Sequence, residues 1–157
     1  MTQAIPRFLN EYINQLTSEF EIKEIWLFGS RANNREKEDS DWDLFVFADP
    51  QVLAALKARM DLKSKDIDLM IVYDGNNFEQ PWTSLSKDGL ERVKNGQLMG
   101  PLWAFRKIND ETAEYWGSIV DEEPVGDQTV KSLQYCTFKM YRIWDKSEKM
   151  ENFSRVE

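Results

Sequence analysis

The stretch IKEIWLFGSRANNREKEDSDWDLFVF, residues 22–47, decides the fold. It opens with a run of β-branched, aromatic and aliphatic residues that stops at Gly29-Ser30, and it closes with a second such run over 41–47. Residues of these types favour strands, and the polar segment between the two runs favours a loop. The stretch therefore predicts a strand, a polar loop and a second strand.

Helical patterns flank this stretch on both sides. Behind Pro6, residues 7–20 carry apolar side chains at three- and four-residue spacing, as in an amphipathic helix. The segment after Asp49-Pro50 is rich in strong helix formers, and its apolar side is expected to comprise Val52, Leu53, Leu56 and Met60. A third strand is predicted at DIDLMIVY, 66–73, with a turn after it. These elements predict an α+β fold, a small mixed β-sheet packed by helices.

The second half of the chain predicts an extension of this core. A short helix is expected over 84–95, ending at Gly96. The runs LWAFRKI and AEYWGSIV on either side of 109–111 predict a β-hairpin. The acidic segment 121–128 is expected to be an exposed connection.

The last apolar segment, QTVKSLQYCTFKMYRIW at 128–144, has near-helical spacing, although its aromatic and β-branched content also permits a strand. We therefore expect a C-terminal extension, from about 97 to 157, that contains a hairpin and a helix. The chain is expected to be one domain over 1–157, with its motif core at 22–74, because 157 residues suit a single core.

Composition excludes several classes of catalytic site. The chain contains no histidine, which excludes Ser-His-Asp and Cys-His nucleophilic sites and histidine ligation of zinc. Its net charge of −8 opposes the basic surface of proteins that bind long nucleic acids. Any catalysis must therefore rely on carboxylates, lysine, tyrosine or metal ions, and a nucleic-acid partner is disfavoured.

The same composition bears on location. No apolar stretch approaches the length that crosses a bilayer, and residues 1–16 do not have the pattern of a secretory signal. The lone cysteine, Cys136, cannot form an internal disulfide, which fits a reducing compartment. We expect a cytoplasmic protein that does not bind membranes.

Chemistry-bearing residues gather around the first two predicted strands. Gly29 permits a tight turn, and Ser30 adds a hydroxyl beside backbone amides that suit a phosphate. Asp41 and Asp43 are two residues apart on a predicted strand, so they share one face. Neighbouring carboxylates repel each other, and a divalent cation relieves that repulsion. Asp68 would join them if its strand lies beside theirs.

The order LFGSRA, a polar spacer, SDWDLFVF and then DIDLMIV resembles the signature of the DNA polymerase β-like nucleotidyltransferase superfamily, in particular its minimal domains. The resemblance covers about 22–74. It implies that Gly29 and Ser30 hold the phosphates of an NTP such as ATP, and that Asp41 and Asp43 bind two Mg²⁺ ions, for which Mn²⁺ is an alternative. It also implies that Asp68 is the third carboxylate.

Several alternatives stay open at this point. Asp66 lies two residues before Asp68 and is a second candidate for the third carboxylate, and Arg31 either contacts the triphosphate or is simply solvated. The resemblance implies transfer of a nucleoside monophosphate to an acceptor, for which a protein or a small molecule is favoured over nucleic acid. The alternative function is an inactive, antitoxin-like module that binds a nucleotide or a partner protein.

Overall fold

The computed structural model describes residues 4–74, 77–82, 96–97 and 105–147. The helices and 3₁₀ turns are α1 (Arg7–Glu19), η1 (Ser30–Ala32), α2 (Pro50–Lys57) and η2 (Met60–Leu62). The strands are β1 (Ile22–Phe28), β2 (Trp42–Ala48), β3 (Ile67–Val72), β4 (Asn77–Glu79), β5 (Gly96–Gln97), β6 (Phe105–Lys107), β7 (Thr112–Val125) and β8 (Gln128–Asp145).

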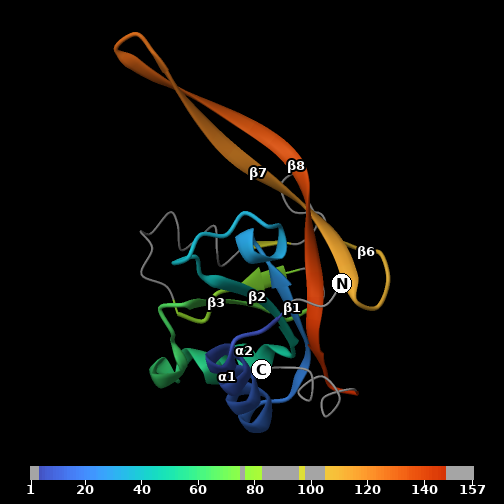
Figure 1. Ribbon diagram of the computed structural model, residues 1–157. Helices are drawn as coiled ribbons and strands as arrows, with labels where there is room; N and C mark the ends of the chain where they lie inside the picture. The colour runs from blue at the N-terminus through green and yellow to red at the C-terminus, as the bar shows by residue number, and fades with distance from the viewer. Residues whose placement is uncertain (1–3, 75–76, 83–95, 98–104, 148–157) are drawn as a thin grey trace.

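Within the described residues, the strands form one sheet of eight in the order β5-β4-β3-β2-β1-β8-β7-β6 (Figure 1). Strands β2 and β3 run parallel and are joined through α2, while the other neighbours are antiparallel. A sheet with both kinds of pairing and two α-helices confirms the predicted α+β fold. The strand that follows the Gly29-Ser30 turn, β2, lies between β1 and β3. This position places the acidic residues at the centre of the sheet.

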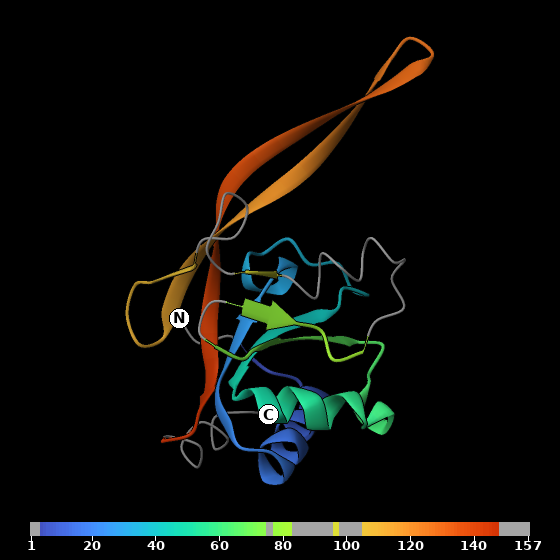
Figure 2. The same ribbon diagram turned by 180° about the vertical axis from the view of Figure 1, so that it is seen from behind.

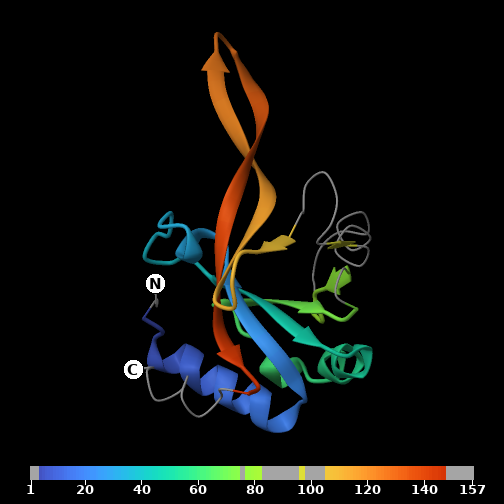
Figure 3. The same ribbon diagram turned by 90° about the vertical axis from the view of Figure 1, so that its right-hand side faces the viewer.

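Both α-helices lie on the same face of the sheet (Figure 3). The predicted stripe of α1 is buried there through Leu9, Ile13 and Leu16, and α2 contributes Val52, Leu53 and Leu56. The helix α2 ends at Lys57, so Met60 begins a 3₁₀ turn and is 61% exposed, contrary to the predicted periodicity. Burial of these apolar side chains against alternate residues of β1, β2 and β3 forms the main core.

A second apolar cluster covers the opposite face of the sheet. The rings of Phe28 and Phe45 stack with centroids 4.0 Å apart, and Phe78 meets Phe45 edge-on at 5.8 Å. Met140 from β8 and Ala113 from β7 are also buried in this cluster. Asp43 and Asp68 occupy alternating positions of β2 and β3 with respect to the main-core residues, so they belong to this second face.

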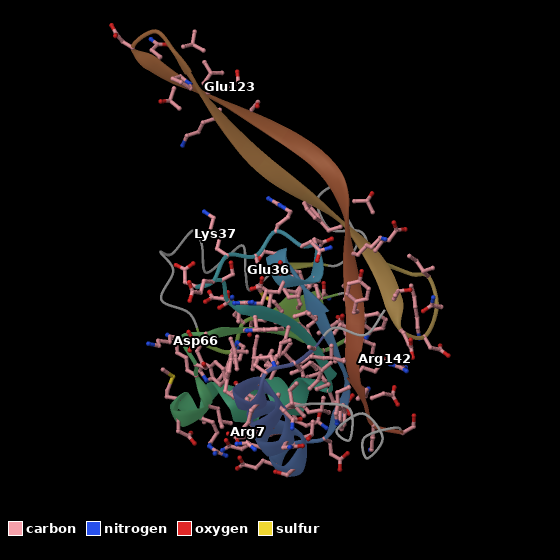
Figure 4. All side chains as sticks on the ribbon, viewed as in Figure 1. Arg7, Glu36, Lys37, Asp66, Glu123 and Arg142 are labelled. Atoms are coloured by element: carbon pink, nitrogen blue, oxygen red, sulfur yellow. The ribbon has the colours of Figure 1, made fainter. Side chains whose placement is uncertain are left out.

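Strands β7 and β8 extend far beyond the rest of the sheet as a long twisted hairpin, which we call the arm (Figures 1 and 2). Side chains of 123–132 near its tip are exposed, and the label of Glu123 marks this distal part in Figure 4. The expected connection at 121–128 is therefore mostly strand, with its turn at Gly126-Asp127.

The predicted C-terminal helix is wrong, because 128–145 form β8. A bulge in the pairing of β1 with β8 separates Ile25↔Trp144 from Trp26↔Arg142. It lets Met140 and Trp144 enter the two different clusters although they are four residues apart. Because of this irregular alternation, the buried residues of β8 are spaced in the sequence as they would be in a helix.

Other expectations for the second half fare differently. The predicted hairpin around 109–111 is confirmed, since β6 pairs antiparallel with β7 through Phe105↔Tyr115 and Lys107↔Ala113. The expected helix at 84–95 lies outside the described residues. In the part of the chain that the structure describes, no helix is long and apolar enough to cross a membrane.

Candidate active site

Asp43 lies on the central strand β2, between the end of β1 and the start of β3. Its Cα partner on β1 is Phe28, the last residue before the Gly-Ser turn, and its Cα partner on β3 is Asp68. Parallel pairing in this register sets the two acids side by side on one face. The structure thus brings together two of the three predicted carboxylates.

The Asp43–Asp68 pair is electrostatically strained. Desolvation by burial, followed by the charges of Asp68 and Asp41 and a hydrogen bond with Asp68, raises the pKa of Asp43 to about 7. Burial and the charge of Asp41 also raise the pKa of Asp68. At neutral pH the pair can hold a proton between its carboxylates. Such pairs are typical of sites that bind a cation or transfer a proton.

The other two predicted acids lie at the margin of this pair. Asp41 is exposed and precedes β2 by one residue, so it does not share the strand as predicted, yet its charge acts on both Asp43 and Asp68. Asp66 is exposed and precedes β3, and its backbone carbonyl accepts a hydrogen bond from the Trp42 N–H at 2.9 Å. Asp68 rather than Asp66 is therefore the acid opposite Asp43.

Gly29 packs directly against the carboxylate of Asp43. Its backbone adopts φ 77° and ψ −158°, a region that is essentially restricted to glycine. A Cβ atom at this position would lie 2.0 Å from Oδ2 of Asp43. The turn therefore requires glycine for two independent reasons, and it places the half-buried Ser30 next to the acidic pair.

Arg31 serves the loop that follows the turn. Its Nε and Nη2 donate hydrogen bonds to the carbonyl oxygen of Ser40 at 3.0 and 2.8 Å, and Nη2 also reaches the carbonyl of Glu38 at 3.3 Å. The guanidinium lies 4.5 Å from the centroid of the Trp42 ring. These contacts close the loop 30–40, whose Glu36 and Lys37 lie at its outer part in Figure 4. Arg31 therefore stabilises the loop, and the predicted contact with phosphate stays a prediction.

One residue near the turn was missed by sequence reasoning. The side-chain amide of Asn33 bonds the carbonyl of Gly29 and both backbone groups of Lys139 on β8. It thus connects the turn to a strand more than a hundred residues away. Nothing in the polar segment RANN distinguishes this asparagine, because its partner on β8 is fixed only by the tertiary fold.

The donor chemistry of the site fits a divalent metal ion. Carboxylate oxygens are the ligands that Mg²⁺ and Mn²⁺ prefer, and the repulsion that raises the pKa of Asp43 is the kind that such an ion relieves. In the described residues, however, no three acidic or cysteine side chains are already arranged as a metal site. A divalent ion bound here would have Asp43 and Asp68 as its inner ligands, and Asp41 would lie at the rim of the site.

Comparison with protein families agrees with this geometry. Residues 10–65 match the family described as polymerase beta, nucleotidyltransferase. The predicted resemblance is confirmed over this matched segment, which runs from α1 through the Gly-Ser turn, β2 and α2. Asp68 follows the matched segment by three residues, so its assignment depends on the register of β3 with β2. Comparison with curated proteins and with solved structures gave no match.

Proposed function

We propose that this protein transfers a nucleoside monophosphate from an NTP to an acceptor. The observation that carries the proposal is the direct pairing of Asp43 with Asp68 beside a turn that only glycine can form. The family match supports a transferase domain of nucleotidyltransferase type.

The residues divide the work as follows. Gly29 and Ser30 would bind the NTP phosphates through the turn, and Asp41, Asp43 and Asp68 would hold two Mg²⁺ or Mn²⁺ ions. The bound ions would neutralise the triphosphate and the leaving pyrophosphate. Asp68, which pairs with Asp43 across β2 and β3, accepts the proton from the attacking atom of the acceptor.

The transfer balances without any further reactant. The acceptor atom forms a bond to the α-phosphorus while the bond from that phosphorus to the oxygen bridging to the β-phosphate breaks. Pyrophosphate leaves with the electron pair, and the proton of the acceptor passes to Asp68. No histidine is needed, in agreement with a sequence that contains none.

The acceptor that the charge favours is a protein or a small molecule. A net charge of −8 repels the backbone of RNA or DNA, and counterion release would contribute little to its binding. The arm offers an extended surface for a protein acceptor, whereas a small acceptor would bind at the acidic pair. We propose this enzyme to act in the cytoplasm, where NTP and Mg²⁺ are abundant.

Label transfer from α-³²P NTPs tests the proposal. We expect wild type, with Mg²⁺, to label either a protein or a small-molecule fraction, and Asp68→Asn to lose at least about a hundredfold in rate. The matched control is Asp66→Asn, which removes an exposed acid two residues away and should keep wild-type activity. Equal labelling by wild type and Asp68→Asn would refute the assigned role. Tight NTP binding without pyrophosphate release would instead support the inactive binding module.

A further inference from the structure

The side chain of Asn33 makes three hydrogen bonds to backbone groups. Its Nδ2 donates to the carbonyl oxygens of Gly29 and Lys139, both at 2.9 Å, and its Oδ1 accepts from the N–H of Lys139 at 2.7 Å. The side-chain amide is thus used on both its donor and its acceptor side. Such a complete pattern is typical of a side chain that fixes the backbone around it.

These bonds extend the sheet past the end of β1. The pairing of β1 with β8 reaches Leu27↔Tyr141, and β1 ends at Phe28. Lys139 is the next residue of β8 whose backbone groups point toward β1, because these groups alternate along a strand. The amide of Asn33 takes the place that a peptide group of a longer β1 would occupy.

The same amide bears on the acidic pair through one intermediate residue. Gly29, whose carbonyl it holds, packs so closely on Asp43 that no Cβ would fit between them. A second contact runs in parallel, since the guanidinium of Arg35 lies 5.5 Å from the ring centroid of Phe138 on β8. The loop 30–40 is therefore attached to the base of the arm at two adjacent residues.

We propose that Asn33 is a positioning residue that holds the Gly29-Ser30 turn against Asp43 by fastening it to the base of the arm. This inference rests on the proposed function, because it assigns the turn to the NTP phosphates. Asn33 touches no reacting atom. It makes NTP binding depend on a strand that lies outside the segment matched by the nucleotidyltransferase family.

Steady-state kinetics of two Asn33 variants test the proposal. Asn33→Ala removes all three hydrogen bonds, whereas Asn33→Asp keeps an acceptor for the Lys139 N–H and loses both donated bonds. We expect KM for the NTP to rise about tenfold in both variants, the factor that corresponds to one hydrogen bond of ordinary strength. The control is Asn34→Gly, since Asn34 is exposed and its φ of 56° suits glycine.

The outcomes separate the two proposals. If wild type neither binds nor transfers nucleotides, the proposed function fails before Asn33 is considered. If wild type is active and both Asn33 variants share the KM of Asn34→Gly, the positioning role is overturned. A lower kcat with unchanged KM, in proportion to the fraction unfolded at the assay temperature, would also overturn it, because it indicates a purely structural role.

Discussion

The body of the protein and its arm are made stable in different ways. Side chains of the body fill two apolar clusters on opposite faces of the sheet. In β7 and β8, the buried hydrophobic residues that the structure describes are Ala113, Met140 and Trp144, all close to the body, while 123–132 are exposed. An isolated two-stranded hairpin is marginal in water. Packing therefore holds the body, whereas the described distal part of the arm, 123–132, is held by backbone pairing.

Two glycines with positive φ give the sharpest comparison of these regions. Gly29 in the body has φ 77° and no room for a Cβ, while Gly126 at the arm tip has φ 63° and nothing within 4 Å of such an atom. We expect Gly29→Ala to lower the free energy of unfolding by about 3 kcal/mol or more, through backbone strain and the collision with Asp43. Chemical denaturation measures this effect.

The matched variant Gly126→Ala should cost about 1 kcal/mol or less, since it brings strain without a collision. Its strain is further relieved by local fraying of the exposed tip. Equal losses at both positions would contradict the division into a packed body and an unpacked arm.

Asp43→Asn is expected to raise the free energy of unfolding, whereas the two glycine substitutions lower it. In the folded chain the pKa of Asp43 is about 7, whereas in the unfolded chain it is near the ordinary value of about 4. Raising the pH from 4 to 7 therefore favours the unfolded chain, and the stability lost in that window stays lost above it. Asparagine removes this loss, so the variant should be more stable than wild type at pH 8 by about 1–3 kcal/mol.

Thermal denaturation without metal at pH 8 and at pH 4 measures this difference, which should disappear at pH 4. Added Mg²⁺ should stabilise wild type and leave Asp43→Asn unchanged. A variant that is less stable than wild type at pH 8 would show that the acidic pair is not strained. Transfer activity should be lost in this variant, as expected for a site that sacrifices stability for function.

Shortening the arm should have the smallest effect. Replacing 119–134 by Asn-Gly keeps the pairing around Gly117↔Cys136 and adds a two-residue turn. We expect the free energy of unfolding to change by about 0.5 kcal/mol or less, because 123–132, which make up most of the removed part, are exposed. Denaturation of the two chains side by side measures this, and a loss of several kcal/mol would make the arm part of the cooperative core.

The sequence was informative where local patterns and burial agree. The runs around Gly29-Ser30, the stripe of α1 and the apolar run of β3 predicted elements that the structure contains. Placing Asp68 beside Asp43 required only that β2 and β3 be neighbours. The elements depend on short stretches of chain, which is why residue types and spacing were enough to predict them, whereas the place of Asp68 followed only from the pairing of β3 with β2.

Other features depend on contacts between distant segments. A bulge in β8 hid its alternation, and pairing with β7 overrode the near-helical spacing of Met140 and Trp144. The sequence pattern also did not predict that β2 begins after Asp41, because pairing with the neighbouring strands determines where the strand begins. Asn33 carried no signal because its task exists only once β8 lies beside the turn.

The place of β8 has a consequence for how the chain folds as it is synthesised. β8 covers the outer edge of β1 through pairs such as Leu27↔Tyr141, although more than a hundred residues separate these two partners in the sequence. Until 141–145 leave the ribosome, β1 presents unpaired backbone groups along an apolar strand, which invites association with other nascent chains. The sheet around the segment that matches the nucleotidyltransferase family is therefore completed only after β8 has been made, and chaperone binding to β1 would be most useful in that interval.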